Sequence, residues 1–443
     1  MPAAILRRHP HDREIWRLAV PAFGALVAEP LYVLADTAIV GHLGTHPLAG
    51  LAIAGTVLTS AFGVFNFLAF GTTAAVARRF GAADHRAAAE HGVAGLWLAA
   101  ALGTALTVLG LALAPVVVDA MGASDDVRPY ALAYLRIGVL GSVPMLLALA
   151  ATGYLRGLQN TRIPLLIAIS ANALNLLLDV VLVYGLDLGI EGSAWATVVS
   201  QTGAAGAYLW AVGRSIVASG ASPRPRRDYV RDALVVGGHL TVRTASLLTA
   251  FTVTTAVASR LGDVEVAAHQ VAWQLWFFLA LALDAIAIAA QAIVGRALGA
   301  GDASAARAGT RRMLEWGALA GTVAAVGVLL LRPVLAGAFT DDGAVRDQLL
   351  DVLWAVALMQ PLAALVFVLD GILIGAGESR YLALAMLAAS AAFIPAALVV
   401  LALDASLLAL WAALYIFVGA RLAGMFARYR TDSWLVTGAV RPA

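Results

Sequence analysis

The sequence predicts an all-α polytopic membrane protein with twelve transmembrane helices, arranged as two six-helix lobes that arose by internal duplication. Of its 443 residues, 61% are hydrophobic and 13% are charged, and long uncharged runs in such a chain are typical of membrane-spanning helices. The second observation is a repeat. Thr37 and Arg78 recur as Thr255 and Arg296 at one constant offset (255 − 37 = 296 − 78 = 218). Fused copies of one bundle are the usual construction of secondary transporters.

Six apolar spans fill the first half of the chain, each about as long as a bilayer requires or longer. They are predicted at 14–41, 48–78, 90–117, 130–155, 162–184 and 192–214. Pro21 and Pro30 interrupt the first span, and proline removes a backbone hydrogen bond and kinks a helix. This kink either lets the helix bend when a nearby group is protonated, or it is a static feature.

Six further spans follow a polar linker. They are predicted at 232–260, 266–295, 311–336, 347–374, 381–402 and 406–428. The run from Ser222 to Arg227 contains two prolines and is the natural boundary between the halves. We therefore expect an N-lobe at 1–217, a cytoplasmic linker at 218–231 and a C-lobe at 232–443.

Arginine predicts the side of the membrane that each loop faces, because the chain contains no lysine. Arginines gather near both termini and in the segments 78–86, 156–162, 224–231 and 296–312. The alternate loops carry aspartate and glutamate instead. Since loops rich in arginine stay in the cytoplasm, we expect a multi-pass protein of the cell membrane with both termini cytoplasmic.

Several classes of function are excluded by residue type. The chain has no cysteine, which rules out disulfides, thiol catalysis and thiolate metal sites. The pI near 9.0 is explained by cytoplasmic loops, and no soluble domain offers a basic face, so no nucleic-acid partner is expected. No spacing of metal ligands appears, and no clustered nucleophile and base that an intramembrane enzyme would need. We expect no catalytic residue, no metal and no cofactor.

Two carboxylates at membrane depth mark the first lobe as the candidate functional half. Asp36 and Asp179 each lie about five residues before the outer end of their predicted spans, and a charge at that depth is costly unless it has a partner or faces water. At the 218-residue offset they align with Thr254 and Ala397. The second lobe has lost both acids, so the two lobes cannot do the same job.

Other polar side chains share that depth. Tyr134 and Thr197 lie near the outer ends of their own spans, and Tyr32 lies one turn before Asp36 on the same helix face. Asn175 precedes Asp179 by one turn and continues a polar stripe that cannot face lipid. We expect these side chains to form one cluster.

Two chemistries suit such a cluster. Two carboxylates in a poorly solvated pocket repel each other and lose hydration, and both effects favour the protonated form. One carboxyl group could then bind and release a proton near neutral pH. The same oxygens would also suit Na⁺. The remaining alternative is a hydrogen-bonded cluster that only fixes helix packing.

A second set of charges lies deeper or in the other lobe. Arg243 could pair with Asp284 within the C-lobe or with Glu29 across the lobes, as a structural salt bridge or as a gate that depends on the conformation. Asp370, near the inner end of its span, is interpreted as an interfacial latch. Because acids outnumber Arg243 within the membrane, the interior should favour cationic ligands.

The aromatic segment of the eighth span has two interpretations. Trp273, Trp276, Phe277 and Phe278 could line an aromatic surface for drugs. They could equally contact lipid or pack within the bundle, which is the more common role of such residues.

Several motifs resemble the multidrug and toxic compound extrusion (MATE) family, closest to its DinF-like branch. They cover nearly the whole chain as two lobes: Val20-Pro21-Ala22, Glu29-Pro30-Leu31, Asp36-Thr37-Ala38, Gly41-His42-Leu43-Gly44, Asn175 to Asp179, Gly192-Ser193-Ala194 with Thr197, Ala268-His269-Gln270 and Gly375-Ala376-Gly377-Glu378. The resemblance implies two lobes that open a central cleft alternately to either side. It places the cation-coupling site at Tyr32, Asp36, Tyr134, Asn175, Asp179 and Thr197.

The resemblance also implies a function. We expect a secondary active antiporter of the MATE/MOP type that exports organic cations or amphipathic drugs in exchange for H⁺ or Na⁺ by alternating access. Asp284 and Asp370 resemble positions of plant-like members that sometimes carry organic anions, so an organic-anion exporter is an alternative. A flippase for lipid-linked saccharides is another, although a nearly lone Arg243 argues against it. Small organic substrates and the lipid bilayer are the expected partners, and a monomer suffices.

Overall fold

The chain folds entirely into helices in the part that the structure describes. The structure is a computed structural model and describes residues 9–440. Eleven of its helical segments are long and apolar enough to cross a membrane. The one remaining expected span, at 192–214, is also a helix, α9 (Gly189–Ser219), but it is not among those eleven. The predicted fold class is confirmed.

The first half of the chain contains α9 and nine other described helical elements, several of them joined end to end. They are α2 (Asp12–Gly41), α3 (Thr45–Val64), α4 (Phe67–Gly81), α5 (His85–Ala120), α6 (Arg128–Gly138), η1 (Val139–Gly141), α7 (Ser142–Gly157), α8 (Arg162–Asp179) and η2 (Val180–Gly185). The span predicted at 48–78 is interrupted at residues 65–66, between α3 and α4.

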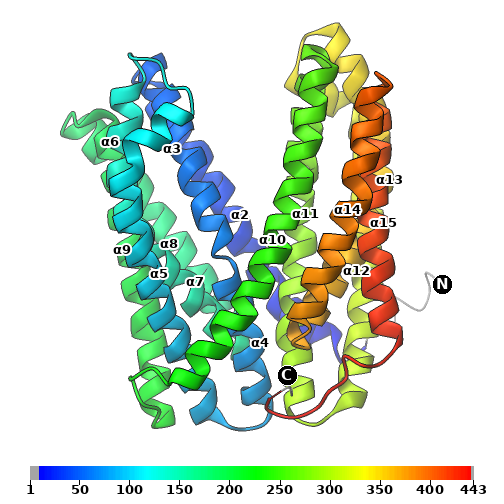
Figure 1. Cartoon of the computed structure of the whole chain (residues 1–443). Coiled ribbons are helices and arrows are strands. Elements are labelled where there is room, and N and C mark those ends of the chain that lie inside the picture. Colours follow the sequence, from blue (N-terminus) through cyan, green and yellow to red (C-terminus); the bar gives the residue numbers. More distant parts are fainter. Residues whose placement is uncertain (1–8, 441–443) are drawn as a thin grey trace. The chain divides into compact units, whose positions relative to one another are not determined.

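The second half supplies six long helices. They are α10 (Arg227–Leu261), α11 (Asp263–Gly299), α12 (Ala303–Phe339), α13 (Gly343–Gly375), α14 (Ser379–Ala402) and α15 (Leu407–Arg430). Within each half the long helices run roughly along a common direction (Figure 1).

Two compact units divide the chain, and both divisions fall inside helices. The N-terminal unit is Val20–Gly237, and the C-terminal unit consists of the residues up to Ala19 together with those from Gly238 onward. The first turns of α2 therefore pack with the C-terminal unit, where Arg312 donates to both carboxylate oxygens of Asp12 at 2.6 and 2.9 Å. The lobe limits expected at 1–217, 218–231 and 232–443 stay a prediction.

Two central helices form the core of the C-terminal unit. The most apolar stretches of α11 and α13 are 72% and 67% buried, whereas that of α12 is 17% buried. The close contact between α11 and α13 depends on Gly371 and Gly375, since a Cβ added at Gly371 would lie 2.3 Å from the carbonyl oxygen of Ala287. Small residues four apart let membrane helices approach closely.

The same contact recurs in the N-terminal unit. A Cβ added at Gly153 on α7 would lie 2.5 Å from the carbonyl oxygen of Ala69 on α4. Both residues of this contact are related to those of the other unit by the repeat (371 − 153 = 287 − 69 = 218). The duplication seen in the sequence therefore preserved a tertiary contact as well.

Matching helix caps repeat at the same offset. Asp84 accepts a hydrogen bond from the backbone N–H of Ala87 at 2.9 Å, and Asp302 accepts one from that of Ala305 at 2.8 Å. The pKa of Asp302 lies below its usual value. The largest cause is the hydrogen bond from the N–H of Ala305, and the next is the bond from the hydroxyl of Ser304. Carboxylates are favoured as caps because helix N-termini leave N–H groups unpaired.

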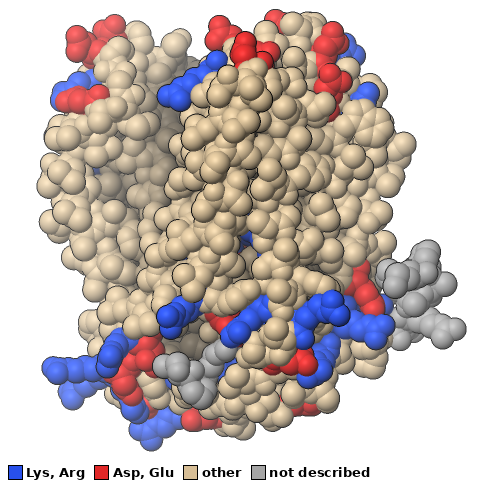
Figure 2. Space-filling model, turned by 45° about the vertical axis from the view of Figure 1, so that its right-hand side comes forward, with Lys and Arg blue, Asp and Glu red and all other residues tan. Residues whose placement is uncertain are grey.

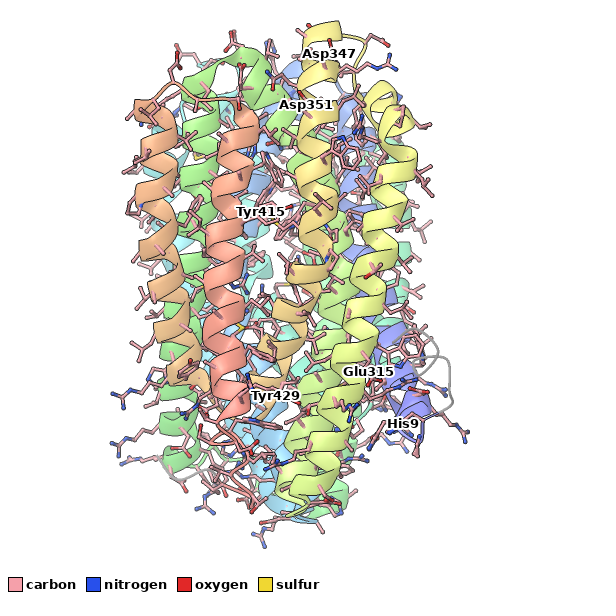
Figure 3. The ribbon with its side chains drawn as sticks, turned by 90° about the vertical axis from the view of Figure 1, so that its right-hand side faces the viewer. His9, Glu315, Asp347, Asp351, Tyr415 and Tyr429 are labelled. Carbon is pink, nitrogen blue, oxygen red and sulfur yellow. The ribbon has the colours of Figure 1, made fainter. Side chains whose placement is uncertain are left out.

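The distribution of charge on the surface suits a bilayer. On the face that Figure 2 shows, a broad belt almost free of charged side chains separates the charges at the two ends. Within the C-terminal unit, Asp347 and Asp351 lie at one end, whereas Glu315 and Tyr429 lie toward the other (Figure 3). The side of the membrane that each end faces stays a prediction.

Candidate functional site

Asp36 is held by two hydroxyl donors in the N-terminal unit. Ser193 Oγ on α9 donates to Asp36 Oδ1 at 2.5 Å, and Tyr134 Oη on α6 donates to Asp36 Oδ2 at 3.4 Å. The Asp36 side chain, on α2, is only 5% exposed. Three helices far apart in sequence thus meet at one carboxylate.

Asp179 ends α8 and is fully buried. With its amide oriented to satisfy both neighbours, Asn175 donates to Asp179 Oδ2 at 2.9 Å and accepts from the backbone N–H of Thr197 at 3.2 Å. The other oxygen, Asp179 Oδ1, has no hydrogen-bond partner within the described residues. This oxygen is a buried acceptor that no described donor satisfies.

Tyr32 completes the cluster. Its hydroxyl lies 2.8 Å from Thr197 Oγ1, which connects α2 to α9 and, through Asn175, to Asp179. The structure therefore brings all six residues predicted for the site into one group of oxygen-bearing side chains. In the described part of the chain, no salt bridge reaches Asp36 or Asp179. The roles of these residues in coupling stay a prediction.

Ser193 belongs to the cluster although the sequence did not single it out as a site residue. Its hydroxyl is fully buried, and it makes the shorter of the two bonds to Asp36. The available signal was its position one turn before Thr197 on the same helix face.

A wide helical turn follows Asp179 directly. Residues Val180–Gly185 form a π-helix, η2, in which the N–H of Leu186 bonds to the carbonyl of Val181 at 2.9 Å. Such turns appear frequently at functional sites, because they change the direction of side chains along a helix. Here the turn begins one residue after the carboxylate.

The cluster contains ligands for Na⁺ but no grouping typical of transition metals. Among the described residues, no three His, Asp or Glu side chains come together. The oxygens of Asp36, Asp179, Asn175 and Thr197 are hard ligands of the kind that bind alkali and alkaline-earth cations. Either a proton or Na⁺ fits this set.

The partner of Arg243 is Asp370, which neither of the two predicted pairings named. Arg243 Nε donates to Asp370 Oδ1 at 3.0 Å, and its Nη2 bonds to Oδ2. Both side chains are buried in the C-terminal unit. Asp370, which the sequence suggested as an interfacial latch, is therefore half of an ion pair within the bundle. Glu29, one of the two expected partners of Arg243, is exposed in the other unit. Asp284 is part of α11.

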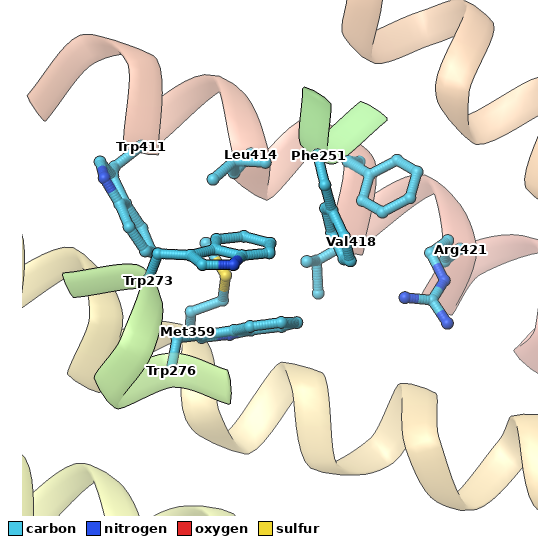
Figure 4. Close-up of a pocket in the computed structure, with 9 residues that line it drawn as sticks. Phe251, Trp273, Trp276, Met359, Trp411, Leu414, Val418 and Arg421 are labelled. Carbon is cyan, nitrogen blue, oxygen red and sulfur yellow. The ribbon is translucent and has the colours of Figure 1, made fainter. Parts of the chain in front are cut away.

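Another buried arginine, Arg421 on α15, was not identified from the sequence. Its side chain is 4% exposed and borders a pocket lined by Trp273, Trp276 and other aromatic side chains (Figure 4). Phe277 and Phe278 are more than half exposed. The aromatic segment of α11 therefore splits between pocket and surface.

Pro21 and Pro30 both lie inside α2, which continues through them as one helix. Pro21 is the second residue after the division between the two units. The remaining backbone bonds keep the helix continuous, and the kink expected at these prolines stays a prediction. Whether α2 bends with protonation stays a prediction.

Comparison with known proteins gives a consistent result. The model of the family described as MatE matches residues 21–181 and 241–399, one segment in each half. DETOXIFICATION 44, chloroplastic, of Arabidopsis thaliana is 32% identical over 436 residues, which cover 95% of this chain and 83% of the relative. DNA damage-inducible protein F of Escherichia coli K12 is 30% identical over 435 residues, covering 96% of this chain and 94% of the relative.

Solved structures agree on the fold. A crystal structure of MATE in complex with MaL6 has a TM-score of 0.87 at 23% identity, covering 97% of this chain and 98% of that one. A MOP superfamily transporter from Pyrococcus furiosus has a TM-score of 0.85 at 22% identity, with the same coverage.

Proposed function

This chain belongs to the MatE family, the multidrug and toxic compound extrusion transporters, and from this premise we propose that it is a secondary antiporter. It exports organic cations or amphipathic compounds in exchange for H⁺ or Na⁺. It is a multi-pass membrane protein. Cell-membrane location, cytoplasmic termini, a monomeric state and the absence of a cofactor other than the coupling ion are parts of the same proposal.

One observation carries the coupling role: two buried carboxylates share an oxygen cluster that contains no salt bridge. A carboxylate kept in a membrane bundle without a cationic partner is expensive. Binding of H⁺ or Na⁺ at Asp36 or Asp179 removes that cost. The duplicate lobe has Thr254 and Ala397 at the matching positions, so only one lobe carries this chemistry.

Ion binding would change the conformational equilibrium through the hydrogen bonds of the cluster. A protonated Asp36 loses the charge that strengthens its bonds from Ser193 and Tyr134, which join α2 to α9 and α6. An ion can favour one conformation only if it binds that conformation more tightly. The substrate must favour the other conformation. Export of substrate is then followed by binding of an ion, which returns the protein to its starting conformation.

The test uses purified protein in liposomes, with ethidium and norfloxacin as substrates. A pH gradient and a Na⁺ gradient are applied separately to wild type, Asp36→Asn, Asp179→Asn and the control Asp126→Asn, which removes an exposed loop carboxylate. We expect one gradient to drive transport in wild type and the control, and neither gradient to do so in the two cluster variants. Wild-type transport by Asp36→Asn would remove this carboxylate from the coupling mechanism.

A further inference from the structure

An open hollow lies beside the first turns of α2 in the C-terminal unit. Its volume is about 470 Å³, and it is lined by Pro10, Arg13, Glu14, Arg17 and, from α11, Arg296. All of these residues belong to the same compact unit. A hollow of this size is within the range of ligand pockets, but its lining is charged rather than apolar.

Guanidinium groups from two helices face this hollow. Arg13 and Arg17 are one turn apart on α2 and are both exposed. Arg296 Nη2 lies 2.6 Å from Glu14 Oε1, which fixes the position of that guanidinium, and the same carboxylate lies 3.9 Å from His11. Within the described residues the guanidinium of Arg13 has no hydrogen-bond or ion-pair partner. The hollow therefore offers donors suited to an anion.

The other acids near the hollow are engaged elsewhere. Asp12 accepts two hydrogen bonds from Arg312, at 2.6 and 2.9 Å. Glu315 lies 2.8 Å from the same guanidinium. Asp302 caps the N-terminus of α12. These carboxylates have cations or N–H groups of their own, so Glu14 is the acid that lines the hollow itself.

The arginines stand on a firmly held segment. Trp316 Nε1 donates to Asp12 Oδ1 at 2.9 Å, beside the two bonds from Arg312. Ile15 and Leu18 point into the unit and are almost fully buried. The first turns of α2 are thus fixed by polar bonds and by packing. A site that is ordered before its ligand arrives loses less entropy on binding.

Two tryptophans indicate that the hollow lies at the level of the lipid headgroups. Trp16, three residues after Arg13, is 46% exposed and meets Trp316 edge to face, with ring centroids 4.8 Å apart. Tryptophan is enriched where the bilayer meets water. Glu315, the neighbour of Trp316 in sequence, lies toward one end of the unit (Figure 3). Arginines also gather along one edge of the uncharged belt in Figure 2.

We propose that this hollow binds the headgroup of an anionic phospholipid. The phosphodiester oxygens accept hydrogen bonds from Arg13 and Arg296, and the acyl chains continue along the uncharged belt beside Trp16. The guanidinium fork matches two oxygens of a phosphate group, and basic clusters at the membrane surface attract anionic lipids. A lipid brings chains that the apolar belt can bury, which free phosphate does not.

This site does not depend on the proposed ion exchange. It needs only that the protein spans a membrane, and binding is measured without a gradient or a transported substrate. Asp36→Asn should bind the lipid as wild type does, whether or not it transports. Failure of one proposal therefore leaves the other standing.

The experiment measures lipid binding to the purified full-length protein in detergent by native mass spectrometry. The probe is dioleoyl phosphatidylglycerol, and dioleoyl phosphatidylcholine, with the same chains and no net charge, is the comparison. We expect wild type to bind phosphatidylglycerol more tightly. Arg13→Gln and Arg296→Gln should each weaken that binding roughly fivefold and reduce the preference for the anionic lipid. Inorganic phosphate at the concentration of the lipid should not displace it.

The matched control is Arg311→Gln. The Arg311 side chain is 83% exposed on α12 in the same unit and lies outside the hollow, so this variant should bind phosphatidylglycerol as wild type does. Because Arg13 is exposed, Arg13→Gln keeps the test decisive even if Arg296→Gln does not fold. Equal binding of the two lipids, an equal loss in Arg311→Gln and Arg13→Gln, or displacement by inorganic phosphate would overturn the proposal.

Discussion

Ser193 and Ser200 provide a matched pair for testing the bond to Asp36. Both serines are buried on α9, but Ser193 donates to the carboxylate whereas Ser200 Oγ has no partner in the described structure. A hydrogen bond to a charged group contributes about 1.5–3 kcal/mol. Ser193→Ala should therefore reduce the initial rate of gradient-driven transport by roughly tenfold or more, and Ser200→Ala should leave it near wild type. Equal rates in the two variants would mean that this bond has no role in transport.

The ion pair of Arg243 and Asp370 should behave as a unit. Removing one partner leaves a buried charge uncompensated, which costs about 3–5 kcal/mol. Arg243→Gln and Asp370→Asn should each lower the midpoint of thermal unfolding in detergent. The double variant should be more stable than the sum of the two losses predicts, because neither charge is then left alone. Additive losses would show that the pair is not coupled.

At the scale of helices, the contact of α11 with α13 depends on the absence of side chains at Gly371 and Gly375. Gly371→Ala would place a methyl group against the backbone of Ala287, so the helices must separate. Such overpacking costs about 1–3 kcal/mol. The control is Gly419→Ala on α15, where nothing lies within 4 Å of an added Cβ. Thermal unfolding should show a loss for Gly371→Ala only, and a matched loss in both variants would contradict this packing.

At the scale of the whole molecule, the distribution of arginine predicts the orientation of every loop. The absence of cysteine makes this easy to test with single-cysteine variants. An impermeant maleimide added to intact cells should label Ser124→Cys, between α5 and α6, and should label Ser222→Cys, between α9 and α10, only after the cells are opened. Labelling of Ser222→Cys in intact cells would reverse the proposed topology.

The two duplicated units keep the same helix contacts and caps but differ in their site residues. The pairs Gly153 with Gly371 and Asp84 with Asp302 keep their contacts at the 218-residue offset. The site residues have diverged, since Asp36 and Asp179 of one unit align with Thr254 and Ala397 of the other. Packing constrains a repeat at every helix contact, whereas a ligand site can diverge once one copy suffices.

The sequence by itself determined the fold class, the repeat and the lobe that carries the acid pair, because composition, a constant offset and helical spacing can all be read along one dimension. It even grouped Tyr32, Asn175 and Thr197 correctly, since equal depth in the membrane brings side chains of different helices to one level. Only the tertiary structure decided which groups touch. Ser193 lies 157 residues from Asp36, Arg243 pairs with a residue 127 positions away, and the burial of Arg421 depends on which face of α15 packs inward. Depth fixes one coordinate of a side chain, but its neighbours depend on how each helix is rotated, and packing alone sets that rotation.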